Sequence, residues 1–500
     1  MKLRKRFFTI AFALVLPFLI IPMAEVDILA ATDSDGYIKI TTAAELDAVR
    51  DNPSSKYRLY ADIDLAGYVS KNNTAEKGWY PIGYGKFFTG VFDGNGHTIQ
   101  GLWSSSKWGI SYKGLFSVLK GAVVKDLTIK LDERGITGGY EVGGLSGVAK
   151  DGTKISGVVV TGGKIVVTGG GYAGGLIGIS RGPNDLIEQC TIIGVSTETS
   201  GNYSAGFIGV LEGQSIIRNS AAFDTVSTGF SYVANFVGAQ KSQSLIENCE
   251  AVGDVTARGS YGGGFAGVIY QQSKINNSRV KGCVHIKLSY AGGFVGAIYG
   301  ASTVTNSYAY SEVSANHYGG GFVGTIYDSS TMDSVCAYGN VTVNNYIAGG
   351  LVGEAVSSTI SNSYARGNVK GTTGVGGLVG YFSGLGSTKK KSITNSYSTG
   401  TVTGSTKLDE LGAFNGRSGV EYKGTNFYNA STAGVSNAYG SAGKPVGDSA
   451  AFPKGKTTEQ LMNKDTFTGW DFKNIWRIYD GDSYPYLAFM GEDSIFGDSH

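Results

Sequence analysis

The sequence predicts an all-β protein: a parallel β-helix, or β-solenoid, of about eleven coils of about 29 residues each, with short capping helices at its ends. Three observations carry this prediction. Glycine accounts for 78 of the 500 residues, whereas proline accounts for 8. A glycine-containing element recurs at a nearly constant interval. The apolar runs around it are short, alternating and rich in β-branched residues, which is typical of strands in stacked units.

The recurring element is Gly-apolar-apolar-Gly, usually preceded by another glycine. Its last glycines follow one another at steps of 27 to 31 residues: Gly147, Gly178, Gly209, Gly238, Gly267, Gly296, Gly324, Gly353 and Gly380. A second element, clearest as Val-Thr-Asn-Ser at 304–307, follows the copies. Equivalent residues of stacked coils lie about 4.8 Å apart, so its asparagines should form a hydrogen-bonded ladder. The ladder consists of Asn219, Asn248, Asn277, Asn306, Asn362, Asn395 and Asn426.

The repeat is built from strands and not from helices. A helical repeat needs runs of about ten or more residues with helical periodicity, and glycine is disfavoured inside helices. The runs here, such as 348–353 and 273–278, are shorter and are bounded by glycine or asparagine. We therefore expect two or three strands per coil, with glycines at corners that need a positive φ or a close backbone approach. A WD-type propeller is the alternative, and its blades of about 42 residues do not match the period.

Four segments are expected along the chain: a signal peptide at 1–31, an N-terminal cap with the first coils at 32–112, the repeats at 113–428, and a C-terminal cap segment at 429–500. Basic residues precede an apolar run at 7–24, which is typical of a secretory signal. An uncleaved membrane anchor is the alternative, because a run of this length reaches the lower limit of a membrane span.

Both ends of the array carry helix signals and tryptophans. The segment 42–50 begins with an N-capping threonine followed by Glu45, and a second short helix is expected at 457–467. A helix at 42–50 would cover the unpaired edge of the first coil. Segments 57–65 and 88–102 would supply the first strands. Apolar caps are indicated by Trp79, Trp103, Trp470 and Trp476.

Tyrosine stands at a repeated place in eight consecutive coils, four or five residues before the Leu or Phe of the glycine element. These residues are Tyr140, Tyr172, Tyr203, Tyr232, Tyr261, Tyr290, Tyr318 and Tyr346, and a shorter parallel row contains Tyr270, Tyr299 and Tyr327. Stacked rings contribute about 0.5–1.5 kcal/mol per pair as plain packing. Rings open to solvent would instead form a platform for sugar rings or another surface. The sequence is compatible with both interpretations.

The repeats contain few candidate catalytic residues. Glycoside hydrolysis needs two carboxyl groups about 5–9.5 Å apart. Asp254 and Glu312 stand at equivalent positions two coils apart, which is about 10 Å. Cys283 occupies the coil between them. Solvated turn residues are the simpler interpretation of this pair.

The four cysteines, Cys190, Cys249, Cys283 and Cys336, show no CxxC spacing for a metal or redox site. Cys190 and Cys249 stand two coils apart, which is too far for a disulfide. We interpret all four as small buried hydrophobic residues.

Several sequence blocks within the repeats and at their two ends can be compared with known families. Gly-Gly-Leu-Val-Gly stands at 349–353 and 376–380, with Asn-Ser-Tyr-Ala-Arg-Gly-Asn-Val between them at 362–369. The array opens with Trp-Tyr-Pro-Ile-Gly at 79–83 and closes with Ser-Tyr-Pro-Tyr-Leu at 483–487. Together these blocks resemble the bacterial GLUG-motif repeat. The resemblance implies an extracellular β-helix of surface and adhesin-like proteins, and it implies no single activity.

Some immunoglobulin A metalloproteases carry such repeats beside a zinc domain with a His-Glu-x-x-His motif. The four histidines of this chain are not followed by glutamate: His97, His285, His317 and His500. The resemblance therefore does not extend to that protease activity.

We expect a secreted or surface-associated, adhesin-like module that presents its tyrosine and asparagine ladders to glycan, cell wall or matrix, without catalysis. A net charge of +2 with 16% charged residues excludes the basic surface of a nucleic-acid-binding protein. No cofactor, no metal and no membrane span after signal cleavage are expected. An extracellular polysaccharide lyase or glycoside hydrolase on the same scaffold is the alternative, and a structural spacer is a third interpretation.

Overall fold

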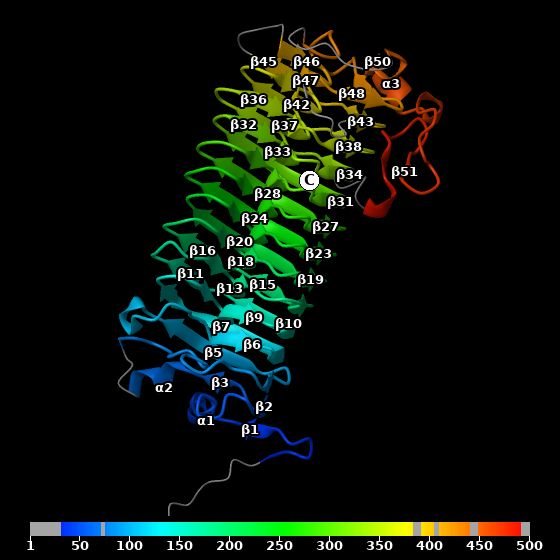
Figure 1. The fold of residues 1–500 in the computed structure, drawn as a ribbon. Coiled ribbons are helices and arrows are strands. Elements are labelled where there is room, and N and C mark those ends of the chain that lie inside the picture. Colours follow the sequence, from blue (N-terminus) through cyan, green and yellow to red (C-terminus); the bar gives the residue numbers. More distant parts are fainter. Residues whose placement is uncertain (1–31, 72–75, 384–391, 405–409, 441–448, 492–500) are drawn as a thin grey trace, which may run out of the picture.

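The computed structural model describes residues 32–71, 76–383, 392–404, 410–440 and 449–491. The strands stack into one continuous column from β1 (Ile38–Ile40) to the C-terminal coils (Figure 1). They form parallel sheets of 29, 11 and 10 strands, and one antiparallel pair, β51 (Trp476–Arg477) with β52 (Tyr486–Leu487). The predicted all-β parallel solenoid is confirmed.

One coil of the middle region shows the arrangement of the repeats. β25 (Gly262–Gly263) belongs to the 10-stranded sheet C and β26 (Ala266–Ile269) to the 11-stranded sheet B. β27 (Lys274–Asn276) and β28 (Arg279–Ile286) belong to the 29-stranded sheet A. This coil has four strands rather than the expected two or three, because Asn277, at φ 47°, divides what the sequence pattern presents as one strand.

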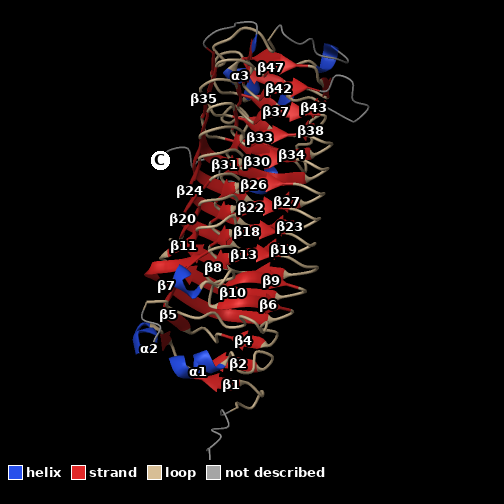
Figure 2. Cartoon of the chain, turned by 60° about the vertical axis from the view of Figure 1, so that its left-hand side comes forward, coloured by secondary structure: helices blue, strands red, loops and turns tan. Residues whose placement is uncertain are grey.

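Sheet B receives one strand from each successive coil, and these strands lie directly above one another (Figure 2). Equivalent residues are paired in turn, as Ala239 with Val268 and Val268 with Ala297. Sheet C runs beside it from β8 (Val142–Gly143) to β46 (Leu411–Gly412). The strands of sheet B are β6 (Phe116–Lys120), β9 (Ser146–Lys150), β13 (Ile177–Ser180), β18 (Ile208–Leu211), β22 (Val237–Gln240), β26, β30 (Val295–Ile298), β33 (Val323–Ile326), β37 (Val352–Val356), β42 (Val379–Ser383) and β47 (Asn415–Ser418).

Inward side chains of successive coils fill the column. Buried phenylalanines stack with ring centroids 4.6–4.7 Å apart: Phe207, Phe236, Phe265, Phe294 and Phe322. The last glycine of each element lies where two coils approach closely. A Cβ atom added to Gly267 would lie 2.5 Å from the carbonyl oxygen of Gly238 in the preceding coil. The φ of Gly267 is not positive, so close approach is what requires glycine there.

The asparagine ladder is present in the middle of the chain. Nδ2 of Asn248 donates to Oδ1 of Asn219 at 3.2 Å, and Nδ2 of Asn277 donates to Oδ1 of Asn248 at 2.7 Å. The members of the row that precede Asn426 have φ between 47° and 55°, a left-handed conformation that asparagine tolerates better than most residues. The prediction that Asn426 belongs to this row is wrong. Its Oδ1 accepts a hydrogen bond from the backbone N–H of Ser396, which places it in the serine row of the coils.

A short helix, α1 (Ala43–Ala48), lies at the N-terminal end of the column (Figure 1). Thr42 and Glu45 form the predicted capping box, and Leu46 is buried in the main core. β1 pairs with β2 (Lys56–Leu59), and β2 pairs with β4 (Val91–Asp93). The remaining elements of the first coils are β3 (Ile63–Asp64), α2 (Ala66–Lys71) and β5 (Thr98–Ser104).

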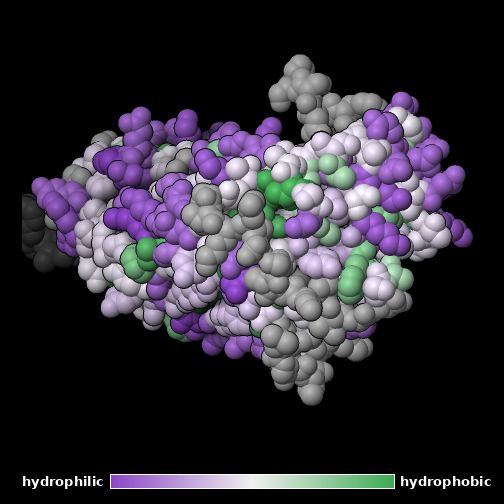
Figure 3. All heavy atoms as spheres, turned by 90° about the horizontal axis from the view of Figure 1, so that it is seen from above, coloured by the Kyte–Doolittle hydropathy of each residue, from purple (hydrophilic) through white to green (hydrophobic). Residues whose placement is uncertain are grey.

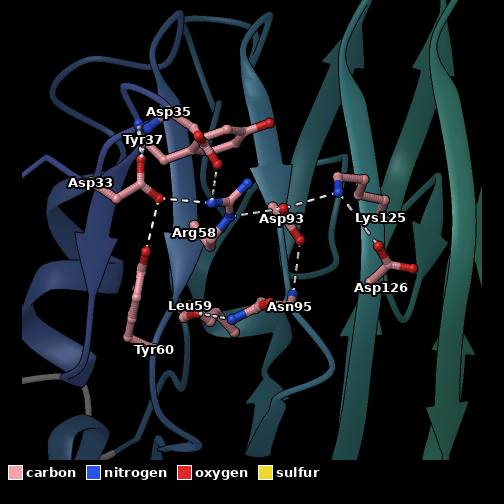
Figure 4. A network of polar contacts seen from close by, with 10 residues as sticks. All are labelled: Asp33, Asp35, Tyr37, Arg58, Leu59, Tyr60, Asp93, Asn95, Lys125 and Asp126. Atoms are coloured by element: carbon pink, nitrogen blue, oxygen red, sulfur yellow. Dashed lines mark hydrogen bonds and ion pairs between the residues drawn. The ribbon is translucent and has the colours of Figure 1, made fainter.

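A polar network joins these first coils (Figure 4). Nη1 of Arg58 lies 2.8 Å from Oδ2 of Asp33 and 3.0 Å from Oδ2 of Asp35, and its Nε lies 3.0 Å from Oδ2 of Asp93. Nζ of Lys125, from the following coil, lies 3.0 Å from the same Asp93 oxygen. Burial by itself would raise the pKa of Asp93, but hydrogen bonds from Lys125, a backbone N–H and Arg58 outweigh it and lower that pKa.

Acidification is expected to loosen the N-terminal coils before the middle of the solenoid. The pKa of Asp93 is lower in the folded than in the unfolded chain. Its stabilising contribution is therefore complete above about pH 4 and is lost as the pH falls through the lowered folded-state pKa. Amide hydrogen exchange at about pH 7 and about pH 3 should show selective loss of protection in β1, β2 and β4. The phenylalanine-stack strands β22 and β26 are the internal control, and equal protection of both regions in acid would contradict the prediction.

The C-terminal tryptophans lie against the side of the solenoid. After β50 (Lys454–Lys456), the chain forms α3 (Thr458–Leu461) and folds back along sheet A (Figure 1). We call residues 458–491 the C-terminal strap. The predicted helix at 457–467 is therefore shorter than expected, and it is followed by the 3-10 turn η4 (Lys464–Thr466).

The strap covers outward-facing aromatic side chains of sheet A. Trp470 and Trp476 pack with Tyr364 and Tyr397 in an apolar cluster that is separate from the main core. The interpretation of these two tryptophans as a cap over the end of the array is wrong. Viewed from above, toward the C-terminal coils, the visible described surface is hydrophilic or intermediate in hydropathy, with strongly hydrophobic residues confined to small areas (Figure 3).

Three of the four cysteines are buried, as predicted, but Cys283 is exposed. The prediction fails for Cys283 because its neighbour Val284 points into an apolar cluster, and alternation along β28 turns Cys283 outward. Within the described part of the chain, no helix is long and apolar enough to cross a membrane. The predicted signal peptide at 1–31 lies outside the described residues.

Candidate functional site: the tyrosine face

The outer side of sheet B carries two rows of tyrosines over an apolar floor. We call this surface the tyrosine face. The floor forms an apolar cluster with the tyrosines, separate from the main core, and its side chains are buried beneath the rings. One floor residue comes from each coil: Val118, Val148, Ile179, Val210, Ala239, Val268 and Ala297.

The first row contains six tyrosines: Tyr172, Tyr203, Tyr232, Tyr261, Tyr290 and Tyr318. Consecutive ring centroids are 4.8–5.2 Å apart, and from Tyr203 onward consecutive rings lie within 15° of parallel. Tyr203, Tyr232, Tyr261 and Tyr290 have φ between 57° and 65°. This left-handed conformation is unusual for a bulky residue and costs about 1–3 kcal/mol where it occurs. Its repetition in four coils means that the surrounding structure imposes it.

Tyr140 and Tyr346, the predicted ends of the first row, are one residue out of register. Ile347, not Tyr346, pairs with Tyr318. At the other end Ala173 pairs with Val142, which places Glu141 rather than Tyr140 beside the row. Tyr140 is 56% exposed and Tyr346 is 49% exposed.

The sequence contains the signal that separates these two tyrosines. Both stand five residues before the Leu of the glycine element, whereas the six members of the row stand four residues before its Leu or Phe. Tyr112, which the spacing did not single out, packs against the floor at its N-terminal end.

The second row lies at the other edge of the floor and contains Tyr270, Tyr299 and Tyr327, as predicted. Consecutive ring centroids are 5.0 Å apart. In the two preceding coils, Glu212 and Lys241 occupy the equivalent positions, and their side chains form an ion pair at 2.7 Å. The tyrosines therefore continue a row that begins with paired charges.

The rings present their edges and hydroxyl groups, because their faces are stacked on one another and their inner edges lie on the floor. Burial raises the pKa of Tyr203 and Tyr327 to about 12, so these hydroxyls stay protonated and can both donate and accept. Within the described residues, no hydrogen bond uses the hydroxyls of the following half-buried tyrosines: Tyr203, Tyr232, Tyr261, Tyr290, Tyr299, Tyr318 and Tyr327.

The floor becomes polar toward the C-terminal coils. Thr325 pairs with Ala297, and Glu354 pairs with Thr325. The Thr325 hydroxyl donates to Oε2 of Glu354 at 3.4 Å, and burial raises the pKa of this carboxyl group. The neutral part of the tyrosine face therefore ends at the Glu354 carboxyl group toward the C-terminal coils. Toward the N-terminal coils it ends at the Glu212–Lys241 ion pair.

The catalytic candidates Asp254 and Glu312 flank Cys283 on the outer surface of sheet A. Cys283 pairs with Glu312, and its N–H donates to Oδ1 of Asp254 at 2.9 Å. Two strand spacings separate the carboxylates, which is about the upper limit for glycoside hydrolases. Burial and both carboxylates raise the pKa of the Cys283 thiol, which makes it a poor nucleophile. All three residues are exposed, and nothing in their geometry favours catalysis.

The same surface holds a pair that the sequence pattern did not single out. Nδ1 of His285 lies 2.6 Å from Oγ of Ser314. The alternation of His285 with Cys283 along β28 was the available signal, because residues two apart share one face of a strand. In the part of the chain that the structure describes, no carboxylate orients the other ring nitrogen of His285, so the pair lacks the third member of a triad. Among these same residues, no group of three or more His, Cys, Asp or Glu is placed to hold a metal ion.

Comparisons with known proteins match parts of this chain. The GLUG motif matches residues 344–370, so the resemblance is confirmed for this segment. Halomucin of Haloquadratum walsbyi (strain DSM 16790 / HBSQ001) is 34% identical over 131 residues, which cover 25% of this chain and 1% of that protein. The chain thus spans about 1% of the length of this curated relative.

Among solved structures, a crystal structure from Bacteroides ovatus of a protein proposed to be an immunoglobulin A1 protease matches with 15% identity and a TM-score of 0.28. The match covers 92% of this chain and 94% of that one. The GLUG motif on a parallel β-solenoid fits a repeat protein of the cell surface or the extracellular space.

Proposed function

We propose that this chain is a secreted or surface-associated, adhesin-like module that binds an extracellular glycan polymer through the tyrosine face, without catalysis. One observation carries the proposal: tyrosine rings repeat along successive coils with centroids 4.8–5.2 Å apart, and their hydroxyl groups have no hydrogen-bond partner among the described residues. A regular row of donors and acceptors suits a ligand that is itself regular, such as a polysaccharide or a cell-wall glycan.

The phenylalanine stack of the core can be compared directly with the tyrosine row. In the core, coils stack through phenylalanines such as Phe236 and Phe265, with centroids 4.6 Å apart. On the tyrosine face the equivalent stacking uses tyrosines such as Tyr232 and Tyr261. Ring packing alone needs no hydroxyl group, whereas a tyrosine adds a polar tip to the same apolar ring. Hydroxyls that are repeated without partners among the described residues support a role in binding.

An extracellular polysaccharide lyase or glycoside hydrolase has less support. Its candidate carboxylates, Asp254 and Glu312, are exposed and are separated by the Cys283 strand. A reducing-sugar and unsaturated-product assay on each bound polymer tests this point directly. Release of product from any of them would overturn the binding-only proposal.

Replacing Tyr232, Tyr261 and Tyr290 together with phenylalanine is expected to weaken polymer binding about tenfold or more. The variant keeps the ring stack but removes three hydroxyls, each worth about 0.5–1.5 kcal/mol in a hydrogen bond to the ligand. Binding is measured as retardation in native affinity electrophoresis with neutral and acidic polysaccharides, and by sedimentation with peptidoglycan. The melting temperature should stay within a few degrees of that of the unmodified chain, because the packing is kept.

The matched control replaces Tyr140 and Tyr346 with phenylalanine. These residues are more exposed but lie outside the row, so retardation should not change. Equal binding by the triple variant and the unmodified chain would show that the ladder serves packing alone.

A further inference from the structure

A trough runs along the solenoid beside the second tyrosine row, at the corner where sheet B turns toward sheet A. Its volume is about 850 Å³, and it crosses successive coils. The chain enters it directly after the tyrosines, so that Gln271 follows Tyr270 and Asp328 follows Tyr327. We call it the glutamine trough, after the side chains that line its middle: Gln214, Ser242, Gln243, Gln271 and Gln272.

We infer that the glutamine trough binds a neutral, hydroxyl-rich polysaccharide that lies parallel to the solenoid axis. This inference rests on the proposed function and names both a separate site and the class of its ligand. The second tyrosine row precedes the trough in each coil but does not line it, and the glutamine amides supply the polar contacts.

The backbone of the trough is left-handed in successive coils, and this conformation does not by itself call for glutamine. Ser242 and Gln243 both have φ 61°, and Gln271 and Gln272 have φ 57° and 61°. Consecutive left-handed residues are best supplied by Gly, Asn or Asp. At its other left-handed corner the chain uses asparagine in most coils, as at Asn248, and glutamine in one, at Gln189. Glutamine in the trough is therefore not demanded by the turn, and its extra methylene carries the amide farther from the backbone.

The amides are ordered along the trough. Nε2 of Gln214 donates to Oε1 of Gln243 at 3.1 Å, and Nε2 of Gln243 donates to Oε1 of Gln272 at 3.4 Å. On the inner side, the Ser242 hydroxyl donates to Oε1 of Gln271 at 3.1 Å. A primary amide has two N–H donors and an oxygen with two acceptor sites, and these bonds use only part of that capacity. The remaining donors and acceptors repeat with the coil spacing of about 4.8 Å.

The chemistry of the trough selects among polymers. Asp328, at its C-terminal end, is the charged residue among those that line it, so neither a polyanion nor a polycation finds matching charges along its length. An extended peptide places side chains of one face about 6.6 Å apart, which is out of step with the coils. A chain of pyranose rings advances by close to one coil per ring, and its hydroxyls, like amides, both donate and accept.

The test compares the full chain with a Gln243→Asn, Gln272→Asn double variant. Asparagine keeps an amide and suits the left-handed backbone, but its reach is shorter by one methylene. Retardation in native gels containing neutral polymers (β-glucan, mannan, xylan or galactan) should fall about tenfold or more, while the melting temperature stays the same or rises. The matched control is Gln189→Asn, at an exposed left-handed position (φ 54°) outside the trough, which should change neither.

Undiminished retardation of the double variant on a neutral polymer that retards the unmodified chain would overturn the inference. Retardation by polygalacturonate alone would also overturn it. If the tyrosine triple variant loses binding while the glutamine variant keeps it, the trough is excluded and the proposed function stands. If no polymer retards the unmodified chain and peptidoglycan does not sediment it, both the proposed function and the trough inference fail.

Discussion

Replacing Gly296 with alanine is expected to lower the free energy of unfolding by about 3 kcal/mol or more. Gly296 is the last glycine of its element and lies in β30. An added Cβ would lie 2.5 Å from the carbonyl oxygen of Gly267 and 2.8 Å from the carbonyl carbon of Tyr261. Both atoms belong to the backbone of the preceding coil and cannot move aside as a side-chain tip can. The coils would have to separate, which weakens the hydrogen bonds and ring stacks between them.

The effect of Gly296→Ala is measured by urea denaturation followed by circular dichroism. Gly170→Ala is the matched control, because an added Cβ there meets nothing within 4 Å and its φ is not positive. We expect that control to stay within about 0.5 kcal/mol of the unmodified chain. Similar midpoints for the two variants would show that close coil approach is not what requires the motif glycine.

Replacing Trp476 with alanine is expected to release the C-terminal strap while leaving the solenoid folded. The Trp476 side chain is fully buried, with ring centroids 4.4 Å from Trp470, 6.0 Å from Tyr364 and 6.1 Å from Tyr397. Removing a buried Trp ring costs about 3–5 kcal/mol. The loss falls on a cluster separate from the main core, so it acts locally. Limited proteolysis should cut within residues 458–491 about 100-fold faster than in the unmodified chain.

Two further variants test whether packing of the Trp476 ring holds the strap in place. Trp476→Phe keeps most of the ring, and the indole N–H that it removes has no hydrogen-bond partner among the described residues, so cleavage should rise only slightly. Trp108→Ala, in the 3-10 turn η1 (Ser106–Trp108) of the first coils, should leave strap cleavage unchanged. A Trp476→Ala chain whose strap stays resistant to protease would show that other contacts hold it in place.

The periodic features of the sequence predicted the architecture because each coil repeats the same local requirements. The spacing of Gly267, Gly296 and Gly324 predicted the stacking interval. The alternation of short apolar runs predicted strands rather than helices. The Thr42–Glu45 pair predicted the helix at the N-terminal end, since a capping box depends only on residues close together in sequence.

The candidate site was only partly predictable. Spacing placed Tyr232, Tyr261 and Tyr290 in one row, but it also admitted Tyr140 and Tyr346. A shift of one residue in register moves a side chain to another part of the surface, and a spacing rule that accepts either of two values cannot detect it. The exposure of Cys283 has a similar origin, because the direction of a side chain depends on the alternation within its own strand.

Contacts between segments that are distant in the sequence correspond to no repeated sequence pattern. Tyr364 meets Trp476 because the strap folds back along sheet A, and nothing in the repeat indicates that path. The glutamine trough arises where side chains of successive coils converge at a corner, although glutamine itself is not part of the repeated motif.

The glycine period and the strand pattern thus establish a stacked parallel solenoid, because local backbone geometry dictates them in every coil. The tertiary structure determines which tyrosines share a row, which of their hydroxyls have no partner among the described residues, and which face the strap covers. These features depend on the register between coils and on packing across long sequence distances. Neither is encoded in the spacing of a single motif.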